Sequence, residues 1–289
     1  MTPESGHRTD ATMNALLSSL SRVRLIAVNT AGEAVRQRYF LVSGLLAAAV
    51  VALSSGLGAM DFGASELKFI ADLGFGALFF FGSLLAVVLP VHLFFSEMEN
   101  RTALTLLARP LRRWEFLAGK LLGVWALLAV LVAALVGVTF VMLWTRHAEL
   151  AQAAMESGRP VPVFAPGGVA LFALLQTVRL GVVAALTLFT CSYARSALFA
   201  YGAGLGWLVA GQTAWLAREW AGFSGGVSEV SALALRAVPD LQAFNLGDAL
   251  IFPGKVAVTS AAGAALLYGL GWMVVLTALG ASLFRSREL

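Results

Sequence analysis

Long apolar stretches occupy most of this sequence and limit what it can fold into. Six of them are long enough to cross a hydrocarbon core of about 30 Å as helices. They cover residues 40–58, 73–95, 121–145, 169–193, 197–216 and 260–284. A helix suits a lipid surrounding because its backbone polar groups bond to one another. Only 12% of the residues are charged, about half the share of a soluble domain. The sequence therefore predicts an all-α membrane protein with six transmembrane helices.

Little of the chain lies outside these stretches. We expect a single membrane domain at residues 22–289, preceded by a flexible cytoplasmic tail at residues 1–21. The tail lacks the charged and then apolar layout of a signal peptide, so we expect it to stay on the chain. Cys191 is the only cysteine, which excludes a disulfide within the chain. The net charge of +4 comes from scattered basic residues, so no nucleic-acid partner is expected.

Lysine and arginine residues are unequally shared between the two sides of the predicted membrane. With the N-terminus inside, 13 of them fall on the inner side and 6 on the outer side. Cytoplasmic loops carry an excess of basic residues, so both termini are expected to face the cytoplasm. The outer connection at residues 217–259 is long and partly apolar. Part of it is expected to dip into the outer leaflet where protein covers its backbone.

The residues before the first predicted span have an amphipathic pattern. Arg22, Asn29, Glu33 and Arg36 share one helical face, and small or apolar residues share the other. These apolar-face residues are Val23, Ile26, Ala27, Ala31 and Ala34. We expect an interfacial amphipathic elbow helix that lies flat on the inner leaflet. A helix solvated in the cytoplasm is the alternative.

The connection between the second and third spans, residues 96–120, is the most informative part of the chain. Residues 98–108 favour a short amphipathic helix with Leu104 and Leu107 on one face and Arg101 and Arg109 on the other. At ~1.5 Å per residue the helix is about 16 Å long, too short to span a bilayer. Pro110 ends it. A helix at this position could transmit a movement of a soluble partner to the spans. The alternative is an inert basic loop.

This connection resembles the first cytoplasmic loop of type-two ABC (ATP-binding cassette) transporter permeases. The family pattern has a pair of acids, a threonine, two leucines, a proline, and later Arg, Glu and Gly-Lys. The matching residues are Glu97 and Glu99, Thr102, Leu106 and Leu107, Pro110, Arg113, Glu115, Gly119 and Lys120. Arg101 stands where many members have glycine. IAVNTAGEAVRQR, VPDLQAFNLGDAL and FRSREL resemble the branch that includes the permease for nitrous oxide reductase maturation.

The resemblance implies a permease subunit of an ATP-driven exporter in a bacterial or archaeal plasma or inner membrane. Its expected partners are a soluble ABC ATPase subunit, a second permease copy or paralogue, and the lipid bilayer. ATP and magnesium would bind to the ATPase and not to this chain. The residues expected to couple the two subunits are Glu97, Glu99, Arg101, Thr102, Leu104, Leu107, Arg109 and Pro110.

The sequence shows no chemistry of its own. It lacks the G-x-x-x-x-G-K-[ST] phosphate loop, so ATP hydrolysis by this chain is not expected. His7, His92 and His147 are scattered, and no metal site is expected. An intramembrane enzyme would need a Ser/Lys dyad or a His/Asp cluster within the spans. An ion-coupled secondary transporter or channel is the alternative function, but it would need buried carboxylates, and Asp72 lies only at the rim of a span.

One arginine lies inside a predicted span. Arg179 is about ten residues into the fourth stretch, and an intramembrane arginine marks a functional site by default. Gln176 precedes it by one turn, and Gln212 lies in the fifth stretch, so the three could share a polar patch in a transport pathway. The alternative is that Arg179 snorkels to the outer interface or bonds to carbonyl groups of a neighbouring helix.

Overall fold

The structure is a computed structural model, and it describes residues 4–36, 38–57, 66–99, 113–158, 163–224, 237–252 and 258–285. Within these ranges the chain is helical and contains no strand, as the sequence predicted. The long helices are α1 (Glu4–Arg36), α2 (Arg38–Leu57), α3 (Glu66–Glu99), α5 (Arg113–Ser157), α6 (Pro166–Tyr193), α7 (Ala197–Ser224) and α10 (Thr259–Arg285). Two short elements, η1 (Gln242–Phe244) and α9 (Gly247–Ile251), lie between α7 and α10.

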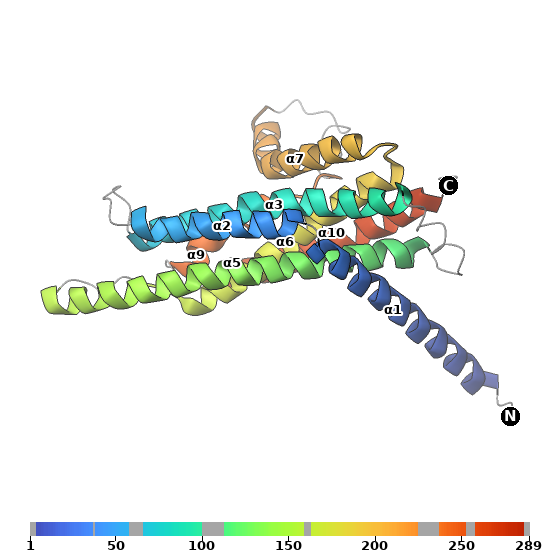
Figure 1. Cartoon of the computed structure of the whole chain (residues 1–289), viewed down its shortest axis with the longest axis horizontal. Coiled ribbons are helices and arrows are strands. Elements are labelled where there is room, and N and C mark those ends of the chain that lie inside the picture. The colour runs from blue at the N-terminus through green and yellow to red at the C-terminus, as the bar shows by residue number, and fades with distance from the viewer. Residues whose placement is uncertain are drawn as a thin grey trace.

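The helix α6 forms the centre of a bundle. It runs alongside α3, α5 and α10 (Figure 1) and also contacts α7 and α9. Every residue from 178 to 188 is buried. A helix that is apolar on all sides is stable only where other helices or lipid surround it. The other long helices therefore pack around α6.

Four helices are long and apolar enough to cross a membrane: α3, α5, α6 and α10. They contain the predicted spans at 73–95, 121–145, 169–193 and 260–284. A fifth candidate is the helix pair Ser18–Arg36 and Leu41–Leu53, which would form one span with a bend of 66° between its two parts. The helix α7, which contains the predicted span at 197–216, is not among these candidates. The described residues thus support four to five spans, and the six-span count stays a prediction.

The two ends of the bundle carry different parts of the chain. At one end, which we call the basal end, α3 ends at Glu99, α5 begins at Arg113, and α10 ends (Figure 1). Residues 100–112, which include most of the predicted coupling helix, lie outside the described residues. At the opposite or distal end, α3 and α6 begin and α5 ends (Figure 1).

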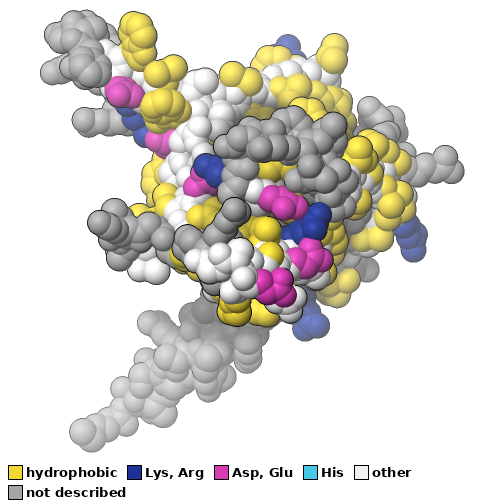
Figure 2. Space-filling model, turned by 90° about the vertical axis from the view of Figure 1, so that its left-hand side faces the viewer, with side chains coloured by type: hydrophobic (Ala, Val, Ile, Leu, Met, Phe, Trp, Pro, Cys, Tyr) yellow, Lys and Arg dark blue, Asp and Glu magenta, His cyan; other side chains and the backbone are white. Residues whose placement is uncertain are grey.

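Charged side chains gather on the distal end (Figure 2). Lys68 of α3 pairs with Asp248 of α9 at 3.1 Å. Arg146 of α5 pairs with Glu66 at 3.2 Å and with Glu149 at 2.6 Å. Exposed pairs of this kind contribute little to stability. Their main consequence is that they mark where the apolar lengths of α3 and α5 end.

Residues 237–252 lie against α6, α7 and α10. Phe244 and Ile251 are fully buried. The backbone N–H of Leu241 donates to the carbonyl oxygen of Gly211 at 3.0 Å, and that of Ala165 donates to the carbonyl oxygen of Ile251 at 3.0 Å. The connection at residues 217–259, which the sequence predicts to be outer, therefore has protein around this irregular part of its backbone. That is the condition for placing it within a membrane.

The helix α1 leaves the bundle obliquely beside the basal half of α5 (Figure 1). It begins at Glu4 and so includes most of residues 1–21, for which the sequence predicted a flexible tail. Part of its predicted apolar face packs on α5, and Val23 and Ala34 are buried. Protein covers this face only in part, since Ile26, Ala27 and Ala31 are half-buried; the interfacial position of the helix on the inner leaflet stays a prediction. The apolar side chains that remain exposed on α1 are Leu20, Leu25, Val28 and Val35.

Candidate functional site

A buried cation lies near the start of α5. Lys120 is 1% exposed, and its Nζ donates to the carbonyl oxygen of Leu93 and lies 3.0 Å from Oε2 of Glu97. The same Nζ lies 5.4 Å from the centroid of the Phe116 ring. Burying two charges is costly, and only a well-bonded pair repays that cost. The pair therefore ties the last turns of α3 to the first turns of α5.

A buried acid in the first turn of α5 makes a second tie, to α1. Glu115 is fully buried. Its Oε1 accepts hydrogen bonds from the hydroxyl of Ser19 and from Nη2 of Arg22, the latter at 3.3 Å. A buried carboxylate is stable only where such donors replace water. Glu115 therefore holds α1 against the start of α5.

Two glycines allow α1 to approach α5 closely. A Cβ on Gly119 would lie 2.7 Å from Cβ of Ile26. A Cβ on Gly123 would lie 2.6 Å from the carbonyl oxygen of Ala27. Small residues four positions apart commonly form the contact between membrane helices because they let two backbones come together. Larger residues at these positions would push α1 away from α5.

These contacts converge on a single region at the basal end. We call it the basal junction and define it as Ser19, Arg22, Glu97, Glu115, Gly119, Lys120 and Gly123. The described chain stops at Glu99 and resumes at Arg113. Both residues that flank the segment 100–112 are therefore close to the junction in sequence, two positions from Glu97 and Glu115. Close-packed interiors transmit strain. A displacement of this segment would therefore reach α1, α3 and α5 together.

Most of the residues predicted to couple the chain to an ATPase are not described. Glu97 is buried in the basal junction, and Glu99 is the last residue of α3. The remaining six, which lie outside the described residues, are Arg101, Thr102, Leu104, Leu107, Arg109 and Pro110. Glu97 is buried and pairs with Lys120, so a part that it takes in coupling would involve α5.

The three polar residues predicted to mark the elbow helix have different surroundings. Glu33 is half-buried and accepts a hydrogen bond of 3.4 Å from the hydroxyl of Ser96 in α3. Asn29 and Arg36 are exposed. The polar face of α1 therefore contacts α3 at Glu33 and α5 at Arg22, whereas Asn29 and Arg36 face outward.

A second buried cation lies near the middle of α6. Arg179 is 1% exposed. Its Nη1 donates to Oε1 of Gln176 and its Nη2 to Oε1 of Gln212, each at 3.4 Å. Its guanidinium carbon lies 3.9 Å from the centroid of the Phe79 ring of α3. The structure thus brings together the three residues that the sequence grouped, and it adds an aromatic ring from a third helix.

A cavity of about 180 Å³ lies beside this cluster. Its walls include Phe75 and Phe172, whose ring centroids are 4.3 Å apart, and Asp72 and Asp248 near the distal end. Gln176 and Phe79 also line it. Because these two side chains contact the guanidinium as well, they separate Arg179 from the cavity.

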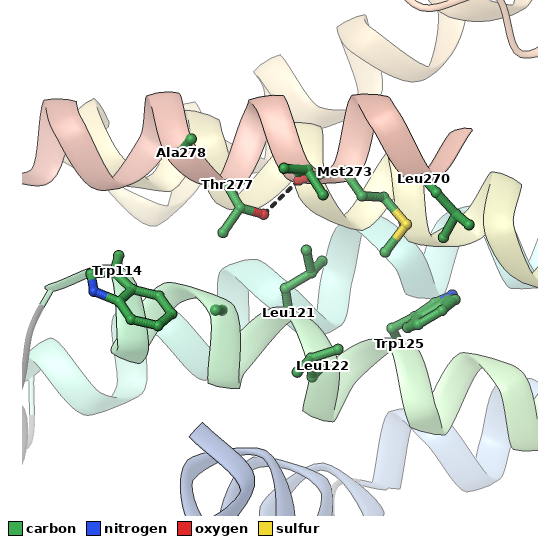
Figure 3. Close-up of a pocket in the computed structure, with 10 residues that line it drawn as sticks. Trp114, Leu121, Leu122, Trp125, Leu270, Met273, Thr277 and Ala278 are labelled. Atoms are coloured by element: carbon green, nitrogen blue, oxygen red, sulfur yellow. Dashed lines mark hydrogen bonds between the residues drawn. The ribbon is translucent and has the colours of Figure 1, made fainter. Parts of the chain in front are cut away.

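A larger groove of about 530 Å³ lies between α5 and α10 (Figure 3). Its lining is almost entirely apolar. The lining side chains include Trp114, Leu121, Trp125, Leu270, Met273 and Thr277. The Thr277 hydroxyl donates to the carbonyl oxygen of Met273 at 2.6 Å, and Nε1 of Trp125 donates to that of Thr177 at 2.8 Å. These polar groups are therefore satisfied within the protein, and the groove suits acyl chains better than a polar ligand.

Sequence reasoning missed the part that charges play at the start of α5. The family pattern contains Glu115 and Lys120, but their partners on α1 and α3 were not predicted. A usable signal was present, because a charged residue next to a long apolar run must find a partner or reach the membrane surface. Phe79 had no comparable signal, since many phenylalanines occur in the spans and most contact only apolar groups.

Among the described residues, no group of three or more His, Cys, Asp or Glu side chains could hold a metal ion. A family model described as ABC-2 family transporter protein matches residues 24–289. This range includes the Arg179 cluster and all of the basal junction except Ser19 and Arg22. No curated protein matches the chain.

Proposed function

The chain belongs to the ABC-2 family of transporter proteins, and from this premise we propose that it is the permease subunit of an ATP-driven exporter. Permeases of this family generally work with a separate ATPase subunit, which would bind ATP and magnesium. The observation that carries the proposal is the basal junction. It fixes both flanks of residues 100–112, the segment that resembles the family's coupling loop.

Residues 98–108 form the coupling helix in this proposal. The helix seats in a groove of the ATPase, with Leu104 and Leu107 in the contact and Arg101 and Arg109 at its rim. A movement of the ATPase then displaces both flanks of the loop. Because the ion pair of Glu97 and Lys120 and the bonds of Glu115 hold those flanks together, α1, α3 and α5 move as one unit.

The proposal places the basal end in the cytoplasm of a bacterial or archaeal cell, with both termini on that side. It counts six spans, which adds α7 and α2 to the four long apolar helices. A second permease copy or paralogue would cover α7, whose apolar side chains are widely exposed: Leu198 by 82%, Val209 by 62% and Trp220 by 70%. The similarity of three stretches to the nitrous oxide reductase maturation branch supports that branch as the finer assignment.

The alternative of an ion-coupled transporter or channel finds no support in the described residues. Their buried carboxylates are Glu97 and Glu115, and both are bonded to basic groups at the basal junction. An acid that carries a proton or sodium ion must bind and release it within the membrane. These two acids are instead engaged as structural ties.

The proposed topology predicts which side of the membrane each segment faces. We expect a reporter that is active only in the cytoplasm to be active when fused after residue 289 or inserted at residue 105. The same reporter inserted at residue 160, in the outer connection after α5, is expected to be inactive. A periplasmic reporter should give the opposite pattern. The reverse pattern at residue 105 would place the basal end outside and contradict ATPase docking there.

The coupling helix predicts different effects for its leucines and its charges. Truncating a buried leucine costs about 2–5 kcal/mol, whereas an exposed ion pair is worth about 0–1 kcal/mol. We therefore expect Leu107→Ala to reduce co-purification of the ATPase strongly and Arg101→Ala to reduce it little. Pro110→Ala should let the helix continue, which would leave the complex assembled but lower its ATP turnover. Wild-type recovery and turnover in all three variants would make the segment an inert loop.

A further inference from the structure

Arg179 is a buried cation without an opposite charge beside it among the described residues. No carboxylate lies within 4.0 Å of its guanidinium in the described part of the chain. Its two hydrogen bonds are 3.4 Å long and go to neutral amides, beyond the usual range of about 2.7–3.2 Å. The Phe79 ring offers a weaker attraction from one side. An arginine that is costly to bury and poorly paired suggests a missing anionic partner.

The cavity beside Arg179 gives such a partner a place. It is about 180 Å³ in volume, and its lining is partly polar and partly aromatic. Gln176 stands between the cavity and the guanidinium. Its Oε1 accepts the long bond from Arg179, and its Nε2 donates another bond of 3.4 Å to the carbonyl oxygen of Phe244. Because both bonds are long, little energy is lost when the amide turns aside and exposes Arg179.

We propose that Arg179 binds an anionic group, a carboxylate or a phosphate, of the molecule that this permease transports. The group enters the cavity from the distal end and replaces the Gln176 amide at the guanidinium, which is suited to bidentate bonds with such anions. The apolar part of the molecule lies against Phe75 and Phe172. The identification with the transported molecule rests on the proposed function, whereas anion binding does not.

The charges around the cavity set a further preference. Asp248 is neutralised by Lys68 at 3.1 Å. Asp72 lines the cavity on the same face of α3 as Phe79, two turns away. Its carboxylate disfavours a second negative charge near the distal end. The site therefore favours a molecule that carries a single anionic group at one end.

A glycine in the cavity wall allows the site to be blocked without removing Arg179. Gly76 lines the cavity, and a Cβ there would meet nothing within 4 Å, so Gly76→Leu is expected to occupy part of the cavity. Gly137 of α5 is equally unobstructed and does not line the cavity, so Gly137→Leu is its matched control. Arg179→Gln tests the cation itself.

Binding of hexyl phosphate to the purified full-length chain in neutral detergent, measured by calorimetry, tests the proposal. The wild type and Gly137→Leu should bind it. Gly76→Leu and Arg179→Gln should lose at least about tenfold in affinity, since hydrogen-bonded anion contacts of this type are strong. Hexyltrimethylammonium should not bind at this site. Asp72→Asn should bind hexyl phosphate somewhat more tightly. Equal binding by Gly76→Leu and the wild type, or no preference for the anion, would overturn the proposal.

Nanodiscs distinguish a soluble anion from a lipid headgroup. If phosphatidylglycerol supplies the anion, it should compete with hexyl phosphate in the wild type, which phosphatidylcholine should not do. If the anion is soluble, the two lipids should give the same affinity. Co-purification of the ATPase, measured on the same preparations, should be unchanged in Gly76→Leu because Asp72 and Asp248 of the cavity lie near the distal end, whereas Glu99 and Arg113 lie at the basal end. Loss of ATPase binding in the wild type would refute the proposed function and leave the anion site standing.

Discussion

Replacing Lys120 with alanine is expected to reduce strongly the amount of folded permease in the membrane. The substitution leaves the Glu97 carboxylate buried without its cation, and it removes the donor to the carbonyl oxygen of Leu93. Breaking a buried ion pair from one side costs about 3–5 kcal/mol, a large part of the ~5–15 kcal/mol that stabilises a typical protein. The measurement is the yield of monodisperse protein in mild detergent, together with its midpoint of thermal unfolding.

Two further variants distinguish the effect of breaking the ion pair from the effect of losing any lysine. Lys68→Ala removes a lysine that is 47% exposed in its own ion pair, and it should leave the yield and the unfolding midpoint nearly unchanged. The double variant Glu97→Leu with Lys120→Met replaces the buried pair by apolar groups, which is often neutral or stabilising. It should therefore restore the yield. A normal yield of Lys120→Ala alone would show that the pair contributes little to the fold.

The double variant also separates assembly from coupling. If the ion pair serves only to hold the fold, the restored protein should support normal ATP turnover with its ATPase. If the pair also transmits the movement of residues 100–112, turnover should stay low although the complex forms. The second result is the one we expect, because apolar side chains can slide past each other where a bonded ion pair cannot.

The long helices could be predicted from the sequence because the bilayer fixes their length. A stretch without charges that is about 20 residues long has few alternatives to a spanning helix, and α3, α5, α6 and α10 follow that rule. The position of α7 was harder to predict, because Gly202, Gly204, Gly206 and Gln212 interrupt its apolar residues. Such a helix suits contact with protein as well as with lipid.

The environment of α1 could not be predicted from its own residues. An amphipathic pattern shows which face is apolar, but lipid and protein cover that face equally well. The information that decides between them lies almost one hundred residues away, in Gly119 and Gly123 of α5. Ser19 and Glu115 are likewise 96 positions apart in the chain, although they are hydrogen-bonded in the fold.

The polar cluster at Arg179 was predicted in part. Gln176 and Arg179 are three positions apart, so helix geometry alone places them on one face. Gln212 could be grouped with them because polar side chains within apolar helices commonly form hydrogen bonds with polar groups of a neighbouring helix. Phe79 could not, since nothing in a run of phenylalanines shows which ring faces a cation. For the coupling helix, the sequence and its family resemblance remain the only basis.

Replacing Gly123 with valine is expected to detach α1 from α5. The new Cβ would lie 2.6 Å from the carbonyl oxygen of Ala27 and 2.7 Å from Cβ of Thr30, and the first of these is a backbone atom that cannot turn away. Overpacking of this kind costs about 1–3 kcal/mol, which shifts the balance of docked and detached α1 by roughly 5- to 150-fold. Undocking α1 relieves the clash, whereas the bundle of α3, α5, α6 and α10 can remain intact.

Trypsin cleavage at Arg22 and Arg24 measures the change, because Arg22 is only one-third exposed while it is bound to Glu115. Gly123→Val should be cut at Arg22 much faster than the wild type, with the unfolding midpoint of the bundle lowered less. Gly137→Val is the matched control: nothing lies within 4 Å of a Cβ at that position, and its cleavage should equal that of the wild type. If both variants are cut at the wild-type rate, α1 does not depend on the glycine contact. In that case the hydrogen bonds of Glu115 carry more of the contact, and Glu115→Ala should release α1.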